Sequence, residues 1–212
     1  MLLPVTCAGC DAVDVTACSE CRAACTPTVR RETVGRIPVW YALEYAGPVA
    51  RLVFAFKNAG RTSVGGVLAG PFRAGVAAAI SGAGGDDLIV VPVPARRASV
   101  RRRGYRPVHV LARRAGIRLT PSLRFSRQPR DQLRLGRLER RDNVGFSMRA
   151  GEEVRGERVL LVDDVLTTGA SIAEGVRAVS AAGGVVVAAA VLARTPAGRR
   201  SRGSLRGRSE VP

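Results

Sequence analysis

The segment Val159–Ser171, VLLVDDVLTTGAS, is the part of this 212-residue chain that most constrains its fold. Its apolar start, Val159–Val162, is typical of a buried parallel strand, and Asp163 and Asp164 follow directly. A hydroxyl-rich turn closed by a glycine then leads to a helix that we expect to begin near Ser171. The order strand, acids, turn and helix predicts an α/β fold with carboxylates and free backbone N–H groups at one edge of a sheet.

These groups suit a sugar phosphate. Carboxylates can hold ribose hydroxyls or a metal ion, and the amides and dipole of a helix N-terminus can hold a phosphate. An alternative needs no ligand, because Ser171 and Glu174 fit the S-x-x-E capping box and acids before a helix suit its dipole. The alternative explains single features of the segment, whereas a sugar-phosphate site explains its strand, acids, turn and helix start together.

The segment resembles the phosphoribosyl-pyrophosphate signature of type I phosphoribosyltransferases, in which two acids precede a TTG-type loop. The resemblance implies that Asp163 and Asp164 form the catalytic centre and hold the 2′ and 3′ hydroxyls of the ribose. It also implies a loop around the 5′-phosphate, made of Thr167, Thr168, Gly169, Ala170 and Ser171.

A second apolar run, Leu88–Val93, predicts another buried parallel strand that ends at the same sheet edge. The strongly basic loop Arg96–Tyr105 follows it and resembles the pyrophosphate loop of the amidophosphoribosyltransferase branch. Guanidinium groups match phosphate oxygens, so Arg96, Arg97 or Arg103 could contact a diphosphate. A solvated basic face or a nucleic-acid patch is the alternative for this loop.

Lys57 is a further candidate ligand for the phosphates, as it follows a helix that we expect after Pro48. An ordinary surface lysine explains the same residue equally well. His109 sits beside apolar residues on the expected helix Val108–Ala115, so we expect a structural role for it.

All five cysteines lie near the N-terminus. Cys7 and Cys10 form one C-x-x-C pair, and Cys18 and Cys21 form a second after seven intervening residues. Two such pairs can present four thiolates to one tetrahedral ion, and in a reducing compartment this favours structural Zn²⁺ over disulfides. Redox-active dithiols are the alternative, and Cys25 either replaces Cys21 or is a free thiol.

The whole chain is expected to divide into four parts. We expect a zinc-binding knuckle at 1–27, a linker and helical lead-in at 28–84, a phosphoribosyltransferase-type domain at 85–195, and a disordered basic tail at 196–212. The expected elements are a linker at Thr26–Pro38, helical spacing over Val39–Phe56, a helix at Val64–Ile80, a strand within Thr120–Arg127, a helix at Ser171–Ala182 and a strand at Val185–Val191.

Taken together, the chain resembles the ComF family of competence-associated, phosphoribosyltransferase-like proteins. The resemblance implies a type I phosphoribosyltransferase-like parallel sheet flanked by helices, behind a small zinc-binding knuckle. It also implies phosphoribosyl pyrophosphate and Mg²⁺ as ligands, an acceptor that the sequence does not identify, and a role in DNA uptake during natural transformation. The matching pieces are the paired cysteines, Lys57-Asn58-Ala59-Gly60, VPVPARR, Arg103-Gly104-Tyr105, Gln132-x-x-Leu135, Arg140-x-x-Asn143 and VLLVDDVLTTGAS.

The chain departs from the family where Arg106 and Pro107 replace the common Asn-Gln after RGY, which puts a ligand role for these two positions in doubt. Gln132, Arg140 and Asn143 would lie in the flexible loop that closes over substrate in these transferases. A basic linker or a DNA contact is the alternative for that stretch.

The net charge of +17 favours polyanionic partners. It supports an alternative function, a non-catalytic protein that binds single-stranded DNA or a competence helicase on a transferase scaffold. Aromatic residues make up only 4%, which argues against a base-stacking platform. We expect no apolar stretch to be long and uninterrupted enough to span a membrane and hence no membrane insertion. The N-terminus lacks the pattern of a signal peptide, so we expect a cytoplasmic protein.

Overall fold

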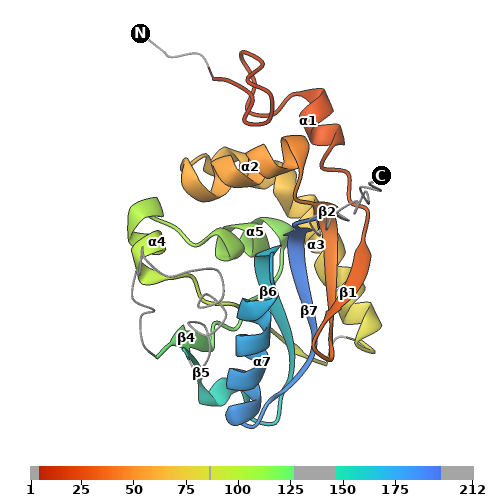
Figure 1. Ribbon diagram of the computed structural model, residues 1–212, viewed down its shortest axis with the longest axis vertical. Coiled ribbons are helices and arrows are strands. Elements are labelled where there is room, and N and C mark those ends of the chain that lie inside the picture. Colours follow the sequence, from red (N-terminus) through yellow and green to blue (C-terminus); the bar gives the residue numbers. More distant parts are fainter. Residues whose placement is uncertain (1–4, 86, 127–146, 197–212) are drawn as a thin grey trace, which may run out of the picture.

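The computed structural model describes residues 5–85, 87–126 and 147–196. A five-stranded sheet in the order β1-β2-β7-β6-β3 forms its centre (Figure 1). Strands β2, β7, β6 and β3 are parallel, and β1 pairs antiparallel with β2 at one edge. The strands are β1 (Arg30–Val34), β2 (Ile37–Glu44), β3 (Ile89–Pro92), β6 (Arg158–Leu166) and β7 (Val185–Arg194), and a separate ribbon joins β4 (Leu123–Phe125) to β5 (Met148–Ala150).

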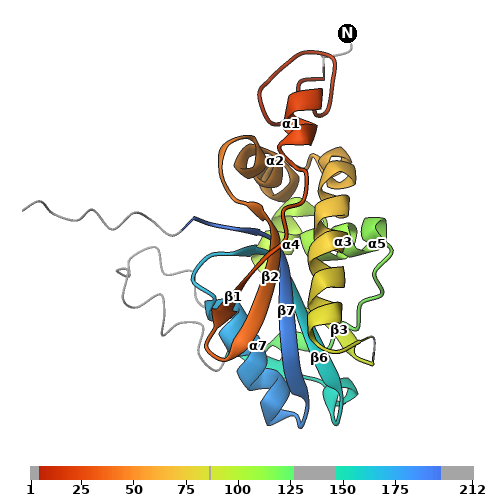
Figure 2. The ribbon, with the colours of Figure 1, turned by 90° about the vertical axis from the view of Figure 1, so that its right-hand side faces the viewer.

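Helices cover both faces of the sheet. Helices α3 and α5 lie on one face and α7 on the other (Figure 2). The helices are α1 (Ser19–Ala23), α2 (Gly47–Asn58), α3 (Gly65–Gly82), α4 (Arg97–Arg103), α5 (Pro107–Ala115) and α7 (Ala170–Ala181), with short 3₁₀ turns η1 (Thr62–Val64) and η2 (Glu152–Val154). This three-layer arrangement confirms the predicted α/β fold with a mostly parallel sheet.

The strands alternate their side chains between two apolar clusters, as the pleat requires. In β6, Leu160 and Val162 pack with α3 and α5, whereas Val159 and Leu161 pack with α7. All four side chains have no exposed surface, which explains why this stretch is apolar without interruption. The central strands therefore hold the site residues that follow them on a rigid, fully buried base.

Several expected elements differ from the structure. The linker at Thr26–Pro38 contains strand β1, and the first part of Val39–Phe56 is strand β2 rather than helix. Residues 39–43 are all buried because β2 is covered on both faces, so the two-residue alternation that marks a strand is absent from the sequence. Segment 28–84 thus supplies two strands and two helices to the same sheet and core.

The basic loop at Arg96–Tyr105 is also largely helical, because α4 spans Arg97–Arg103. This helix has no buried residue and ends at Gly104, whose positive φ of 78° provides a left-handed cap. The predicted helices at Val64–Ile80 and Val108–Ala115 are confirmed as α3 and α5, and the predicted strand at Val185–Val191 as β7.

Thr62–Gly82 is long and apolar enough to span a membrane by length and composition, contrary to the expectation that no stretch would be. Half of its most apolar window is buried inside the protein, and α3 packs against β2 and β7 as the core helix of a globular domain does. Gln132, Arg140 and Asn143, and all but the first residue of the expected tail, lie outside the described residues.

Candidate functional site

The acid pair lies near the carboxyl end of β6, at the sheet edge where ligands of such folds gather. The strand continues two residues past the acids to Leu166, so it is longer than Val159–Val162. One carboxylate oxygen of Asp163 accepts a hydrogen bond from the backbone N–H of Asp164 at 2.8 Å. Burial, and then the negative charge of Asp164, raise the pKa of Asp163 to about 7. Asp163 therefore takes up and releases its proton near neutral pH.

Lys57 comes from the last turn of α2 and reaches the same acids from 107 residues away in the chain. Its Nζ lies 2.8 Å from Oδ1 of Asp164, and the exposed fractions of the two side chains are 23% and 13%. The ammonium therefore belongs to the site and is not an ordinary surface group. Its role toward phosphate stays a prediction.

A cavity of about 180 Å³ opens in front of the acid pair. It lies between the end of β3, helix α4, the start of α5 and the end of β6. Its charged and polar lining consists of Lys57, Arg96, Ser99, Arg103, Arg106, His109, Asp163, Asp164 and Ser171. The structure thus brings together the acids, the lysine, one residue of the phosphate loop and two of the three predicted arginines.

Arg97, the third predicted arginine, lines an adjoining cavity of about 310 Å³ instead. That cavity shares Arg96, Arg106, His109 and Phe125 of β4 with the first one. Sequence reasoning missed Arg106 and His109. Their spacing of three residues at the start of α5 puts them on one face of the helix, which is the signal that could have found them.

His109 is half buried, and this burial, together with the positive charge of Arg106, lowers its pKa. The imidazole is therefore neutral near pH 7, and it adds hydrogen-bonding capacity to the cavity wall without adding charge. The cationic groups of the site are then Lys57 and the arginines around it.

The predicted phosphate loop forms the turn from β6 into α7. Gly169 caps this helix with a φ of 77°, and a Cβ atom at this position would lie 2.8 Å from the side chain of Val34 on β1. Glycine is therefore needed there for two reasons, its backbone angle and the close approach of β1. Thr167 and Thr168 are exposed, and of the five loop residues only Ser171 lines the cavity with the acids.

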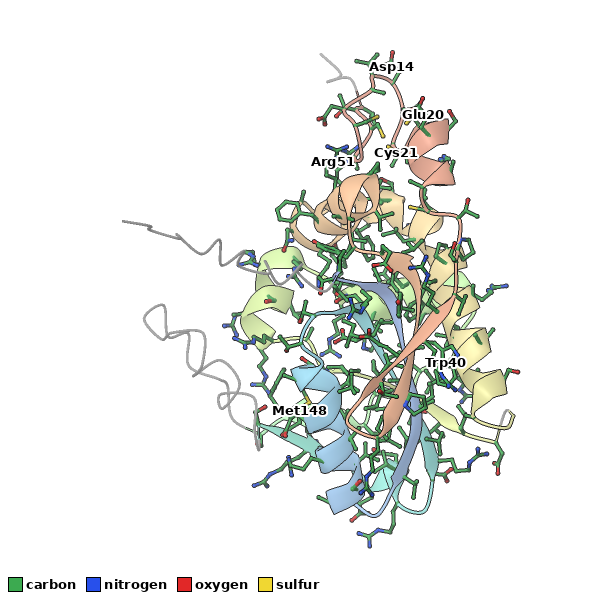
Figure 3. The ribbon with its side chains drawn as sticks, turned by 45° about the vertical axis from the view of Figure 1, so that its right-hand side comes forward. Asp14, Glu20, Cys21, Trp40, Arg51 and Met148 are labelled. Atoms are coloured by element: carbon green, nitrogen blue, oxygen red, sulfur yellow. The ribbon has the colours of Figure 1, made fainter. Side chains whose placement is uncertain are left out.

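The capping-box alternative for this helix is wrong. The N-cap residue of α7 is Gly169 and not Ser171, and the Glu174 carboxylate makes its contacts elsewhere. Its buried carboxylate accepts a hydrogen bond from the backbone N–H of Met148 and pairs with Arg177, both at 2.8 Å. Glu174 thereby ties strand β5 to α7; Figure 3 shows Met148 beside this helix.

The N-terminal cysteines form one cluster. The sulfur atoms of Cys7, Cys10, Cys18 and Cys21 all lie within 4.8 Å of one another. Zn–S bonds of about 2.3 Å place the sulfurs of a tetrahedral site about 3.8 Å apart, so this donor set fits a zinc ion. Cys25 is buried outside the cluster, and burial raises its pKa to about 11. The suggestion that Cys25 replaces Cys21 is therefore wrong.

The backbone around the cluster favours thiolates. Burial opposes ionisation of Cys7, but the N–H groups of Cys18 and Gly9 point at its sulfur, and the pKa of Cys7 falls to about 6. A Cβ atom on Gly9 would lie only 2.5 Å from the sulfur of Cys21, so the loop approaches the cluster as closely as glycine allows. The four-cysteine cluster could thus bind zinc, and Figure 3 shows Cys21 on the side of the knuckle that faces α2.

Fold and site together define an α/β protein with paired acids and a helix N-terminus at the carboxyl edge of a parallel sheet, an arrangement suited to sugar phosphates. Residues 98–205, half of the chain, match the phosphoribosyl transferase domain family. The chain belongs to this family, as the acid-pair segment indicated.

Two kinds of curated relatives are similar to this chain. The orotate phosphoribosyltransferase of Rhizorhabdus wittichii is 50% identical over 56 residues, which cover 26% of this chain and 28% of that protein. The adenine phosphoribosyltransferase of Kineococcus radiotolerans is 35% identical over 106 residues, which cover 50% of this chain and 57% of that protein. The chain thus spans between about a quarter and somewhat over half of these relatives.

Two solved structures also resemble the chain. They are an allosteric regulatory enzyme of purine biosynthesis, with a TM-score of 0.34, and the glutamine phosphoribosylpyrophosphate amidotransferase of B. subtilis, with a TM-score of 0.36. Both are 21% identical; each likeness covers 63% of this chain and about a quarter of the other one.

Proposed function

We propose that this protein binds phosphoribosyl pyrophosphate together with Mg²⁺ at the acid pair and acts as a phosphoribosyltransferase. The main support is that one cavity holds Asp163 and Asp164 beside Lys57, Arg96 and Arg103. Carboxylates suit the ribose hydroxyls, and the three cations suit the phosphates. Membership of the phosphoribosyltransferase domain family supports the same assignment.

The reaction proposed is substitution at C1 of the ribose, with diphosphate leaving. Its transition state carries positive charge on the ribose and growing negative charge on the diphosphate. Asp163 and Asp164 would orient the ribose through its hydroxyls, and Arg96 and Arg103 would stabilise the departing diphosphate. Mg²⁺, when bound with the substrate, neutralises part of the same charge.

Lys57 would change partner during this cycle. Its ammonium lies against Oδ1 of Asp164, the carboxylate that would also hold a ribose hydroxyl. A ribose bound to Asp164 would release the ammonium toward the phosphates, which keeps the number of ion pairs in the cavity unchanged. We propose Lys57 as a phosphate ligand for this reason.

Calorimetric titration with phosphoribosyl pyrophosphate and Mg²⁺ tests the proposed ligand. The wild type should bind, and the double variant Asp163→Asn/Asp164→Asn should not, whereas the matched control Glu157→Gln, at an exposed acid beside the same strand, should bind normally. A wild type that does not bind in the presence of Mg²⁺ would refute the proposal. Release of diphosphate with candidate bases then screens for the acceptor.

We also propose that the knuckle holds one structural zinc ion through Cys7, Cys10, Cys18 and Cys21. The close approach of the four sulfurs and the N–H groups directed at them support it. Four clustered thiols also suit the cytoplasmic location that we expect. The ion would join the two arms of the knuckle, since each C-x-x-C pair supplies two ligands.

A second proposed function is binding of single-stranded DNA, as in a protein of the ComF type that works with a helicase during DNA uptake. A net charge of +17 and the exposed arginines of the α4 region support it. Those arginines are Arg96, Arg97, Arg101, Arg102 and Arg106. Fluorescence anisotropy with a labelled oligonucleotide separates the two functions: DNA binding that survives loss of the acid pair is independent of the sugar-phosphate site.

A further inference from the structure

Lys57 is the only lysine among the 34 lysine and arginine residues of this chain. At every other cationic position the sequence carries arginine, so a position that keeps lysine stands out. Its ammonium sits 2.8 Å from Asp164 in a cavity also lined by Arg96 and Arg103, and an ammonium is a more compact charge than a guanidinium. The position of this one side chain therefore matters to the site.

The end of α2 that carries Lys57 is held at three points. Lys57 pairs with Asp164 of β6, and Asn58 accepts a hydrogen bond from the guanidinium of Arg103 on α4 at 3.2 Å. Just beyond the helix, the guanidinium of Arg61 donates to the backbone carbonyl of Thr6 in the knuckle. Within five residues, the chain thus contacts the acid strand, the basic helix and the cysteine module.

The knuckle also rests directly on α2 (Figures 1 and 3). A Cβ atom on Gly9 would lie 3.5 Å from Leu52, which has no exposed surface. Cys7 and Cys21 belong to the same buried apolar cluster as Leu52 and Phe56 of this helix. One turn of α2 separates Leu52 from Phe56, which directly precedes Lys57, so packing against the knuckle fixes the helix that presents the ammonium.

We infer that the cysteine knuckle positions Lys57, so that the metal state of the knuckle sets ligand affinity at the acid pair. Arg61 is the positioning residue that connects the two, because its partner, Thr6, directly precedes the metal-ligand candidate Cys7. Loss of the ion separates the arms of the knuckle, moves the Thr6 carbonyl and frees the end of α2. This inference rests on the zinc site and the ligand site proposed above.

The coupling between zinc binding at the knuckle and ligand binding at the acid pair must act in both directions. If the ion raises affinity for the ligand, the ligand must raise affinity for the ion by the same factor, because the two equilibria share one thermodynamic cycle. A knuckle that merely stabilises its own fold would show no such reciprocity. The inference therefore predicts that phosphoribosyl pyrophosphate slows removal of zinc by a chelator.

The single lysine provides a direct test. Trace acetylation of the full-length protein, followed by mass spectrometry of the peptide that contains Lys57, measures the reactivity of this ammonium alone. Stripping zinc with a chelator should raise the acetylation rate at Lys57 by at least about fivefold. Arg61→Ala should do the same with zinc still bound, and the control Arg36→Ala, at an exposed turn between β1 and β2, should not.

Ligand binding completes the test. Calorimetry with phosphoribosyl pyrophosphate and Mg²⁺ should show affinity about tenfold weaker in the zinc-free protein and in Arg61→Ala than in the wild type. In a Lys57→Met background, zinc removal should change affinity far less, because the connecting side chain is gone. Circular dichroism should show that Arg61→Ala keeps the folded structure and its zinc.

The outcomes separate the inference from the function on which it rests. Equal acetylation rates with and without zinc and in Arg61→Ala would overturn the inference. Strong ligand binding that ignores zinc and Arg61 would also overturn it while leaving the proposed function intact. No ligand binding in any form, together with zinc-dependent acetylation, would refute the proposed ligand and still support the positioning of Lys57 by the knuckle.

Discussion

Replacing Asp163 by asparagine should change how the stability of this protein depends on pH. Burial and the neighbouring Asp164 raise the pKa of Asp163 to about 7 in the folded state, from an ordinary value of 3.8. Between these two values the folded protein holds a proton that the unfolded chain releases. Because the folded state binds more protons there, the free energy of unfolding falls as pH rises through this window and levels off above pH 7.

The size of the effect follows from the shift in pKa. One pKa unit corresponds to about 1.4 kcal/mol, so a shift of about three units sets an upper limit of about 4 kcal/mol. Asp163 lines an open cavity and lies near the positive charge of Lys57, so water and the ammonium stabilise part of its negative charge. We therefore expect a loss of about 2 kcal/mol between pH 5 and pH 8. Asparagine has nearly the same shape and no charge, so the variant should lack this loss.

Urea unfolding followed by circular dichroism, without Mg²⁺ or ligand, measures the difference. The free energy of unfolding of Asp163→Asn minus that of the wild type should be about 2 kcal/mol larger at pH 8 than at pH 5. The control Glu157→Gln replaces an exposed acid near the start of β6 and should follow the wild type at every pH. Parallel curves for wild type and Asp163→Asn would show that Asp163 does not carry a proton near neutral pH.

Three further outcomes are expected. Phosphoribosyl pyrophosphate with Mg²⁺ should raise the melting temperature of the wild type by mass action, and the double variant Asp163→Asn/Asp164→Asn should fold but show no shift in differential scanning fluorimetry. Metal analysis should find one zinc per chain, with occupancy lowered by Cys7→Ser and unchanged by Cys25→Ser; the reverse pattern would refute the ligand set. Binding of single-stranded DNA should weaken with salt, with a log–log slope of roughly 0.7 per phosphate contact, and should survive in the double acid variant; affinity that is flat with salt would contradict it.

The sequence predicts the acid strand and its turn well because their determinants are local. An apolar run, two acids and a glycine all lie within about ten residues of one another. Gly169 shows this most clearly, since both its φ of 77° and the contact with Val34 require glycine. The four clustered cysteines are local in the same sense, because they all lie within 15 residues of the chain.

Contacts between segments that are far apart in the chain are not predicted by local sequence patterns. The pairing of Lys57 with Asp164 joins residues that are 107 positions apart, and the sequence offered Lys57 as a phosphate ligand without indicating this ion pair. Glu174 is the opposite case: Ser171 and Glu174 satisfy a capping pattern, yet the carboxylate binds the N–H of Met148, which lies 26 positions upstream. Tertiary partners compete with local ones, and here the carboxylate pairs with the backbone N–H of a buried strand residue instead of the first turn of its own helix.

Helix α4 shows a third reason for a wrong prediction. It has no buried residue, so its sequence carries no apolar period to mark it as a helix. Arginine is a good helix former, however, and Gly104 provides a left-handed cap. Intrinsic propensity and a cap therefore identify a surface helix that hydrophobic periodicity misses.

The surplus of positive charge would contribute differently to binding of phosphoribosyl pyrophosphate and of single-stranded DNA. The exposed arginines Arg96, Arg97, Arg106 and Arg124 line the adjoining cavities, and the less exposed acid pair lines the smaller one. A cavity of about 180 Å³ admits part of a sugar phosphate and is too small for a DNA strand. DNA would therefore contact these four exposed arginines and not the acids. Its affinity would come from neutralisation of its phosphates and not from recognition of a ribose. The same arginines would serve both ligands, so a bound DNA backbone and a bound diphosphate would compete for their guanidinium groups. Only the sugar phosphate would also need the acids.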